Sequence, residues 1–308
     1  MPSLQSLKLP ELSHTVLEAL RRQGVTTLEH FLTRVDPLDI PDEAGCGTSN
    51  SKALEAILRH IQHAHSPPVL TGIQLEADLR RTRSSSTGYE SVDGLLRGGL
   101  RSAHVYEVTG VSGSGKTQVC LSAVASYVGD GLGNVIYVDT TNSFSAERVA
   151  GILRQRFGQA QNIPAVLGNI KVLNAFDSHS LLNLIDELQI NREVDVGMLV
   201  IDSLSALVGP VLGRGQTQGH NIMISLGNAL RQLALDRNAV VLYTNHSVGG
   251  GRPEDQSAAE HKPALGVSWR NQPHVRVQVS LPARATDDGK RHARVVNGGE
   301  PGEVSFCI

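Results

Sequence analysis

The chain has 308 residues, of which 40% are hydrophobic and 4% aromatic, and its formal net charge is −2. The length allows two domains with a sizeable core, whereas the charge excludes a general attraction to nucleic acid and the few aromatic residues argue against a long base-stacking platform. No apolar run approaches the ~18 residues of a membrane-spanning helix, and the N-terminus lacks the pattern of a secretory signal. The three cysteines lie far apart in the sequence, which indicates reduced thiols in a reducing compartment.

Residues 1–62 are predicted to form a small all-helical N-terminal domain. Val16, Leu17 and Leu20 form an apolar stripe at helical spacing, and signals for two further helices follow. Residues 63–86 are predicted to be a linker, since they contain a Pro-Pro pair and end with three serines. Four apolar residues of this linker either pack on the chain's own core or dock on a neighbouring subunit, namely Leu70, Ile73, Leu75 and Leu79.

Residues 87–308 are predicted to form one α/β domain, because strands and helices alternate along them. Strands are expected at 104–109, 134–139, 170–174, 197–202 and 239–245, and helices at 116–129, 145–158, 178–192 and 219–236. The alternation is typical of a mostly parallel sheet with helices on both faces. Beyond residue 275 the apolar pattern changes to period two around an Asp-Gly turn, which predicts antiparallel strands at one edge of the sheet.

A phosphate-binding loop of the form G-x-x-x-x-G-K-[ST] follows the first of these strands. Its positions are filled by Gly110, Val111, Ser112, Gly113, Ser114, Gly115, Lys116 and Thr117. Glycines let consecutive backbone N–H groups point at phosphate oxygens, and the start of the next helix adds favourable partial charge. We expect Lys116 to neutralise the β- and γ-phosphates of ATP, Thr117 to ligate Mg²⁺, and Gln118 to lie beside the nucleotide.

The strand at 197–202 ends in Asp202, which is predicted to hold the magnesium shell together with Thr117. The alternative role of Asp202 is a helix cap or a turn. Lys116 and Asp202 are 86 positions apart, with two predicted strands between them. This spacing disfavours simple nucleotide kinases and favours ATPases in which another strand lies between the two motif strands. We interpret the strand that ends at Asp139 as that inserted strand.

Several segments resemble the ATPase core of RecA-family recombinases. They are Thr87–Leu100, Glu107–Gly110, Gly115–Gln118, and Asp139-Thr140 with Phe144 and Glu147-Arg148. The helical N-terminal domain fits eukaryotic and archaeal members, and the segments Thr244–His246 and Lys262–Gly266, with Trp269, are most similar to the type-D group of eukaryotic recombinase paralogues. The resemblance implies a RecA-like P-loop ATPase core, ATP and Mg²⁺ as cofactors, and a nuclear role in homologous-recombination DNA repair.

Two departures from the family pattern limit this expectation. Active recombinases carry Asp-Thr-Glu-Gly after the second core strand, and the Glu positions the attacking water, whereas this chain has Thr141 at the matching place. The loss of a positioned base costs about 10²–10⁴-fold in rate, so we expect at most a weak DNA-dependent ATPase. The linker also lacks the Phe-x-x-Ala that inserts into the adjacent subunit of a filament, which favours a defined hetero-oligomer over a long filament.

Two loops resemble the DNA-binding loops of the family, namely residues 209–219 with Arg214 and residues 247–261 with Arg252. The alternative is that both are flexible surface loops, since three acidic residues of the second loop oppose DNA binding. The strand before the second loop leads to His246, which either senses the γ-phosphate or satisfies a backbone group. The segment 262–266 resembles the part that caps a neighbour's ATP, or else it is a lead-in to the last strands. The cluster at Arg80, Arg81 and Arg83 is either a solvated face or a contact for DNA or an acidic partner.

The resemblance implies partners as well as a fold. A type-C paralogue is expected at the N-terminal domain, an X-ray-repair paralogue at the core, and the filament-forming recombinase on single-stranded DNA. Three alternatives stay open at this point. They are a strand-exchange recombinase in its own right, a P-loop kinase of small molecules, and a scaffold with a vestigial ATP site.

Overall fold

The computed structural model describes residues 14–22, 55, 59, 70–158, 162–212, 216–248, 262, 263, 265, 269, 271–282, 289–299 and 302–308. The chain divides into two compact units, Met1–Leu75 and Glu76–Ile308. In the first unit, helix α1 (His14–Arg22) confirms the first predicted helix, and its Leu20 is buried. Most of the two further predicted helices lies outside the described residues. The domain boundaries at 62 and 86 therefore stay a prediction.

Helix α4 (Gly72–Arg81) lies inside the segment predicted to be a linker. It begins with a reciprocal cap, because Gln74 N donates to Thr71 Oγ1 (3.3 Å) and Thr71 N donates to Gln74 Oε1 (2.8 Å). Leu70, Ile73 and Leu75 are exposed, so these three do not pack in a core. The Thr-x-x-Gln pattern could have predicted this helix from the sequence.

A nine-stranded sheet forms the centre of the second unit, in the order β11-β10-β9-β3-β7-β6-β4-β5, with β8 (Lys262–Pro263) paired to β7. The five parallel strands match the predicted ones and are β3 (Val105–Gly110), β4 (Val135–Asp139), β5 (Ile170–Asn174), β6 (Met198–Asp202) and β7 (Val240–Val248). The strands at the other edge are β9 (Val275–Ser280), β10 (Lys290–Asn297) and β11 (Glu303–Cys307). Strand β9 runs parallel to β3, and β10 pairs antiparallel with both β9 and β11. The antiparallel extension was predicted, whereas β11 was not, although Val304 and Phe306 alternate with polar residues.

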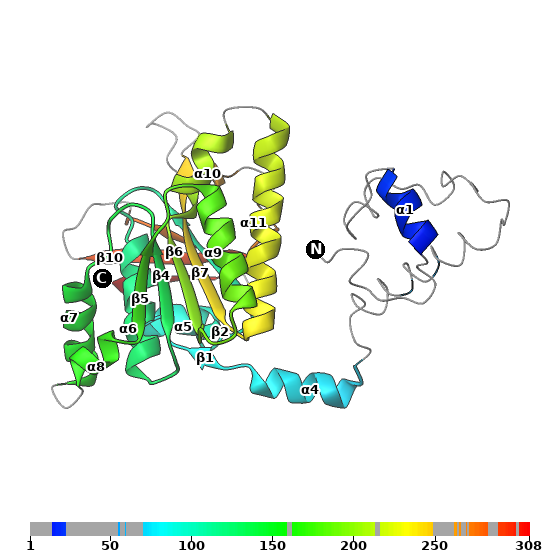
Figure 1. The fold of residues 1–308 in the computed structure, drawn as a ribbon. Helices are drawn as coiled ribbons and strands as arrows, with labels where there is room; N and C mark the ends of the chain where they lie inside the picture. The colour runs from blue at the N-terminus through cyan, green and yellow to red at the C-terminus, as the bar shows by residue number, and fades with distance from the viewer. Residues whose placement is uncertain are drawn as a thin grey trace. The chain divides into compact units, whose positions relative to one another are not determined.

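Helices cover both faces of this sheet, as predicted (Figure 1). One face packs against α6 (Lys116–Gly129), α7 (Ala146–Phe157) and α8 (Ile163–Leu167). The other packs against α9 (Ser178–Ile190), α10 (Leu204–Leu212) and α11 (Gln216–Arg237). The short helix α5 (Glu90–Leu95) contacts β11, and the two-residue strands β1 (Ser84–Ser85) and β2 (Leu100–Arg101) pair with each other. Strands β4 and β6 are buried along their whole length because both faces are covered.

Two expectations about this unit were wrong. The strand between the two motif strands β3 and β6 is β7, and β4 lies on the far side of β6. Order along the chain does not fix order in a parallel sheet, because each crossover can pass one or more strands. The predicted loop at 209–219 is also largely helical, since α10 runs to Leu212 and α11 starts at Gln216. Trp269 is fully buried.

Candidate functional site

The phosphate-binding loop joins β3 to α6, and its glycines are required by the backbone path. A Cβ on Gly110 would lie 2.2 Å from the carbonyl oxygen of Val279 and 2.6 Å from Ser114 Oγ. Gly113 and Gly115 have φ values of 77° and 102°, in the left-handed region that glycine adopts at little cost. The loop therefore curls tightly before the first turn of α6, where backbone N–H groups have no helical acceptor.

The Lys116 side chain lies along the inside of this loop. Its Nζ donates to the carbonyl oxygens of Gly110 (2.9 Å) and Val111 (2.8 Å). Burial lowers the pKa of this ammonium group, and the Asp202 carboxylate partly offsets that effect. Lys116 thus holds a positive charge at the loop while most of its stem is shielded from water.

Asp202 ends β6 and collects hydrogen bonds from several hydroxyl groups. Its Oδ2 accepts from Thr117 Oγ1 (2.7 Å), Tyr137 OH (3.0 Å) and Ser143 Oγ (3.5 Å), and its Oδ1 accepts from Thr244 Oγ1 (2.5 Å). The residue is 3% exposed. Burial, Cys120 and Asp202 raise the pKa of the Tyr137 phenol, which stays a donor to the carboxylate. The two predicted magnesium ligands, Thr117 and Asp202, are therefore in direct contact.

The segment after β4 carries hydroxyl groups where active recombinases carry a carboxylate. Asp139 Oδ1 accepts from the backbone N–H groups of Thr141 (3.0 Å) and Ser143 (3.1 Å), and its Oδ2 accepts from Phe144 N (2.8 Å). Asn142 takes a left-handed φ of 56° in this turn. The Thr141 and Ser143 hydroxyls are 2.9 Å apart. Asp139 is therefore committed to holding the turn.

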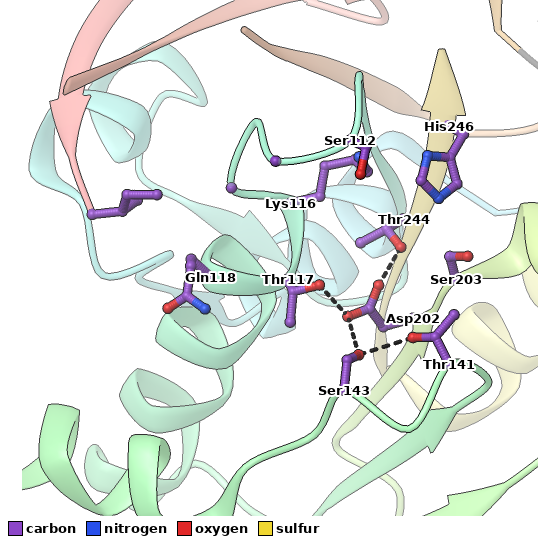
Figure 2. A pocket seen from close by; sticks show the side chains of 13 residues that line it. Ser112, Lys116, Thr117, Gln118, Thr141, Ser143, Asp202, Ser203, Thr244 and His246 are labelled. Atoms are coloured by element: carbon purple, nitrogen blue, oxygen red, sulfur yellow. Dashed lines mark hydrogen bonds between the residues drawn. The ribbon is translucent and has the colours of Figure 1, made fainter. Parts of the chain in front are cut away.

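A cavity of about 300 Å³ lies between the loop and the carboxyl ends of β4, β6 and β7 (Figure 2). Its lining residues are Ser112, Gly113, Gly115, Lys116, Thr117, Gln118, Thr141, Ser143, Asp202, Ser203, Thr244, His246 and Ile308. In Figure 2, Gln118 lies on one side of Asp202, and Thr141, Ser203 and His246 lie on the other. The imidazole of His246 is exposed toward the cavity, and its pKa is lowered by burial and by Lys116.

The structure brings together most of the residues predicted from the motifs. Gly110, Val111 and Ser114 belong to the loop but do not line the cavity. Arg214 and Arg252 lie outside the described residues. The sequence reasoning did not assign Ser143, Ser203, Thr244 or Ile308 to the site. Ser143, Ser203 and Thr244 lie close in sequence to motif residues at strand ends, and this proximity could have predicted their place at the site. Ile308 directly follows β11, and nothing in the sequence near it indicates that it reaches the site.

A buried polar network lies behind the site, on the opposite face of β3 and β7. Glu107 is fully buried and its Oε2 accepts from Arg276 Nε (2.7 Å), while its Oε1 accepts from Asn245 Nδ2 (2.7 Å). Trp269 Nε1 donates to Tyr243 OH (2.9 Å). Burial raises the pKa of the Glu107 carboxyl, and Arg276 opposes this. The network fixes Asn245, the neighbour of His246, relative to the strand that carries the loop.

The oxygen donors in the cavity fit Mg²⁺, which favours one or two protein oxygens combined with substrate phosphates. Thr117 supplies a hydroxyl and Asp202 a carboxylate, and their contact places both at the mouth of the loop. Within the described part of the chain, no group of three or more His, Cys, Asp or Glu side chains is arranged to hold a metal ion. None of the described helices is long and apolar enough to cross a membrane.

Comparison with known proteins identifies the family. The Rad51 family model matches residues 80–297. The chain is 34% identical over 278 residues to DNA repair protein RAD51 homolog 4 of Bos taurus, covering 87% of this chain and 82% of that protein. It is 32% identical over 289 residues to the Mus musculus protein of the same name, covering 91% and 85%. A probable DNA repair protein RAD51 homolog 4 of Dictyostelium discoideum is 29% identical over 266 residues, covering 73% of each chain.

These matches span the phosphate-binding loop, the parallel sheet and the strand that ends in Asp202. They agree with the RecA-like core and with the similarity to type-D paralogues seen in the sequence. The Rad51 family is a family of ATP-binding P-loop proteins that generally use Mg²⁺. The chain belongs to the Rad51 family and is a recombinase paralogue that acts in DNA repair by homologous recombination.

Proposed function

We propose that this recombinase paralogue binds ATP with Mg²⁺ in the cavity above the phosphate-binding loop, and that nucleotide occupancy controls which partners it binds. The observation that carries the proposal is the contact of Thr117 with Asp202, 2.7 Å apart, beside the buried Lys116. A cation, a hydroxyl and a carboxylate at the N-terminus of α6 are the groups that a Mg²⁺-triphosphate requires. When bound, Mg²⁺ supplies charge neutralisation between the phosphates.

Turnover of the bound ATP is proposed to be slow. Thr141 carries no carboxylate, and Asp139 is engaged by three backbone N–H groups. Without a positioned base, the rate falls by about 10²–10⁴-fold relative to an active recombinase. The protein then acts as a nucleotide-stabilised assembly factor: ATP at about 100 times its dissociation constant stabilises the binding state by about 2.7 kcal/mol. A weak DNA-dependent ATPase activity is compatible with this role.

The assembly is proposed to be a hetero-oligomer of paralogues in the nucleus. A helical domain at 1–62 would bind a type-C paralogue, a linker at 63–86 would separate it from the core, and the core at 87–308 would bind an X-ray-repair paralogue. The complex would assist the filament-forming recombinase on single-stranded DNA, with Arg214 and Arg252 as DNA contacts. The similarity to relatives named DNA repair protein RAD51 homolog 4 supports this assignment.

The experiment is a calorimetric titration of the full chain with ATP, with and without Mg²⁺. We expect saturable binding that Mg²⁺ strengthens, and loss of that binding in Lys116→Ala, because the variant removes the charge held inside the loop. Lys171→Ala, which changes an exposed lysine on β5, is the control and should bind like the unaltered protein. Absence of ATP affinity in the unaltered protein, both alone and with its partner chains, would refute the proposal.

A further inference from the structure

Among the described residues that line the nucleotide cavity, one has a buried hydroxyl group without a hydrogen-bond partner. Ser203 follows Asp202 directly, lines the cavity and is 3% exposed, and its Oγ is buried without a partner. The other hydroxyls on this wall are engaged. Thr117, Ser143 and Thr244 donate to Asp202, and Thr141 pairs with Ser143. Because a buried polar group without a partner costs free energy, Ser203 Oγ requires an explanation.

The backbone of Ser203 is fixed more firmly than its side chain. Ser203 N donates to Thr140 Oγ1 (2.6 Å), and the same hydroxyl donates to the carbonyl oxygen of Ser203 (2.9 Å). Thr140 N in turn donates to the carbonyl oxygen of Asp202 (2.9 Å). These three bonds tie the end of β6 to the end of β4, and so the backbone of Ser203 is held at one place on the cavity wall.

The two ends of the cavity differ in chemistry. Next to Gly115 the wall is formed by Ile308 and Arg291, since Ile308 Cδ1 would lie 2.9 Å, and Arg291 Cγ and Nε each 3.8 Å, from a Cβ at that position. At the other side of Asp202, three groups able to donate hydrogen bonds gather from three neighbouring strand ends, namely Thr141, Ser203 and His246 (Figure 2). The apolar side chain of Ile308 suits a base or sugar, whereas the terminal phosphate of a nucleotide suits the donor-rich end.

We propose that Ser203 Oγ donates a hydrogen bond to the terminal phosphate of the bound nucleotide, and that this bond makes the site prefer ATP to ADP. The inference rests on the proposed function, because it assumes that the cavity holds a nucleotide. A phosphate oxygen at the donor-rich end supplies the acceptor that the buried hydroxyl lacks. The diphosphate does not reach that end, so ADP leaves Ser203 without a partner.

The test compares the affinities of Mg²⁺-ADP and of a nonhydrolysable Mg²⁺-ATP analogue by calorimetry. In Ser203→Ala we expect the affinity for the analogue to fall by about ten-fold, the size expected for one hydrogen bond to a charged group, while that for ADP stays within about two-fold. Ser203→Cys keeps a side chain of similar size but offers only a weak S–H donor, and should shift the preference in the same direction.

Ser178→Ala is the matched control. Ser178 Oγ is likewise buried without a partner, but it lies at the start of α9 and does not line the cavity. Its substitution should leave both affinities unchanged. Neither substitution removes the partner of another group, so neither alanine variant should have a lower thermal midpoint than the unaltered protein.

Two results would overturn the inference while leaving the proposed function intact. They are unchanged affinity for the analogue in both Ser203 variants, and an equal loss of affinity for the analogue and for ADP. If the unaltered protein binds neither nucleotide, alone or with its partner chains, the proposed function itself fails. The two failures are therefore distinguishable.

Discussion

Replacement of Asp202 separates its structural role from its role at the metal. In Asp202→Asn the amide oxygen can accept the bonds now made to Oδ2 by Thr117, Tyr137 and Ser143, and the amide nitrogen can donate to Thr244 Oγ1. These bonds lose the contribution of the charge, but burial of the carboxylate no longer costs free energy. We expect the free energy of unfolding to change by no more than about 1 kcal/mol.

Asp202→Ala removes the acceptor altogether. Tyr137 and Thr244 are fully buried, and their hydroxyls lose the acceptor that they have in the unaltered protein. Each unsatisfied buried donor costs about 1–3 kcal/mol, which gives a loss of about 4 kcal/mol for the two. The alanine variant should therefore be much less stable than the asparagine variant, although both lack the charge.

Urea unfolding at constant pH measures the free energy of unfolding of each variant. Calorimetric titration with ATP, with and without a fixed Mg²⁺ concentration, measures how much the metal strengthens ATP binding. In Asp202→Asn we expect Mg²⁺ to strengthen ATP binding about 10–100-fold less than in the unaltered protein, the range seen when a metal loses one supporting group. ATP binding measured without Mg²⁺ should change little. If the alanine variant is as stable as the asparagine variant, the hydrogen bonds to Asp202 do not carry the assigned weight. If Mg²⁺ acts on Asp202→Asn as on the unaltered protein, Asp202 does not support the metal.

Three further predictions follow from the geometry. Thr141→Glu places a carboxylate at an exposed position of the cavity, and we expect ATP turnover, measured by phosphate release, to rise by about 10²-fold. If turnover does not rise, the lack of a carboxylate at position 141 does not limit the rate. Glu107→Ala leaves the guanidinium of Arg276 buried without its carboxylate and should cost about 3–5 kcal/mol in urea unfolding, whereas Glu107→Leu with Arg276→Met should cost far less; equal losses would contradict this. The pKa of His274 is lowered to about 4 by burial, His104 and Arg231, and its Nδ1 accepts from Val105 N (2.9 Å). Between pH 7 and pH 5 the imidazole of the unfolded chain, with its ordinary pKa of 6.5, binds a proton, whereas the imidazole of the folded chain does not. The free energy of unfolding should therefore fall by about 1 kcal/mol over this range, after allowance for solvent screening of this half-buried group. The His274→Gln variant should lack this part of the pH dependence.

Much of the fold could be predicted because its signals are local. The apolar runs at β3, β4, β6 and β7 match buried strands, and the four predicted helices match α6, α7, α9 and α11 within a few residues, whereas α8 and α10 were not predicted. The phosphate-binding loop was predicted in full, since its glycines are required by the turn itself. The helix α4 and strand β11 were missed although the sequence carries a capping box at Thr71 and an alternation around Phe306.

The errors concern relations between distant segments. Strand β4 was expected between the motif strands and lies outside them, because the order of parallel strands depends on how far each crossover travels. The segment 209–219 was expected to be a loop because its position resembles that of a DNA-binding loop of the family, yet α10 runs to Leu212 and α11 starts at Gln216, and both helices pack on the sheet through residues outside this segment.

The sequence by itself determined that a phosphate-binding loop motif, a strand ending in Asp202 and a threonine at position 141 occur in one α/β chain, because each is a property of a few adjacent residues. Only the tertiary structure decided how they meet. The register of β4 with β6 sets Thr141 and Asp202 at one cavity, the antiparallel edge brings Ile308 to the loop, and Thr140 holds Ser203 against the same wall. Which hydroxyls are engaged by Asp202 and which one is left for a ligand depends on distances between strand ends, and no pattern along the chain encodes those distances.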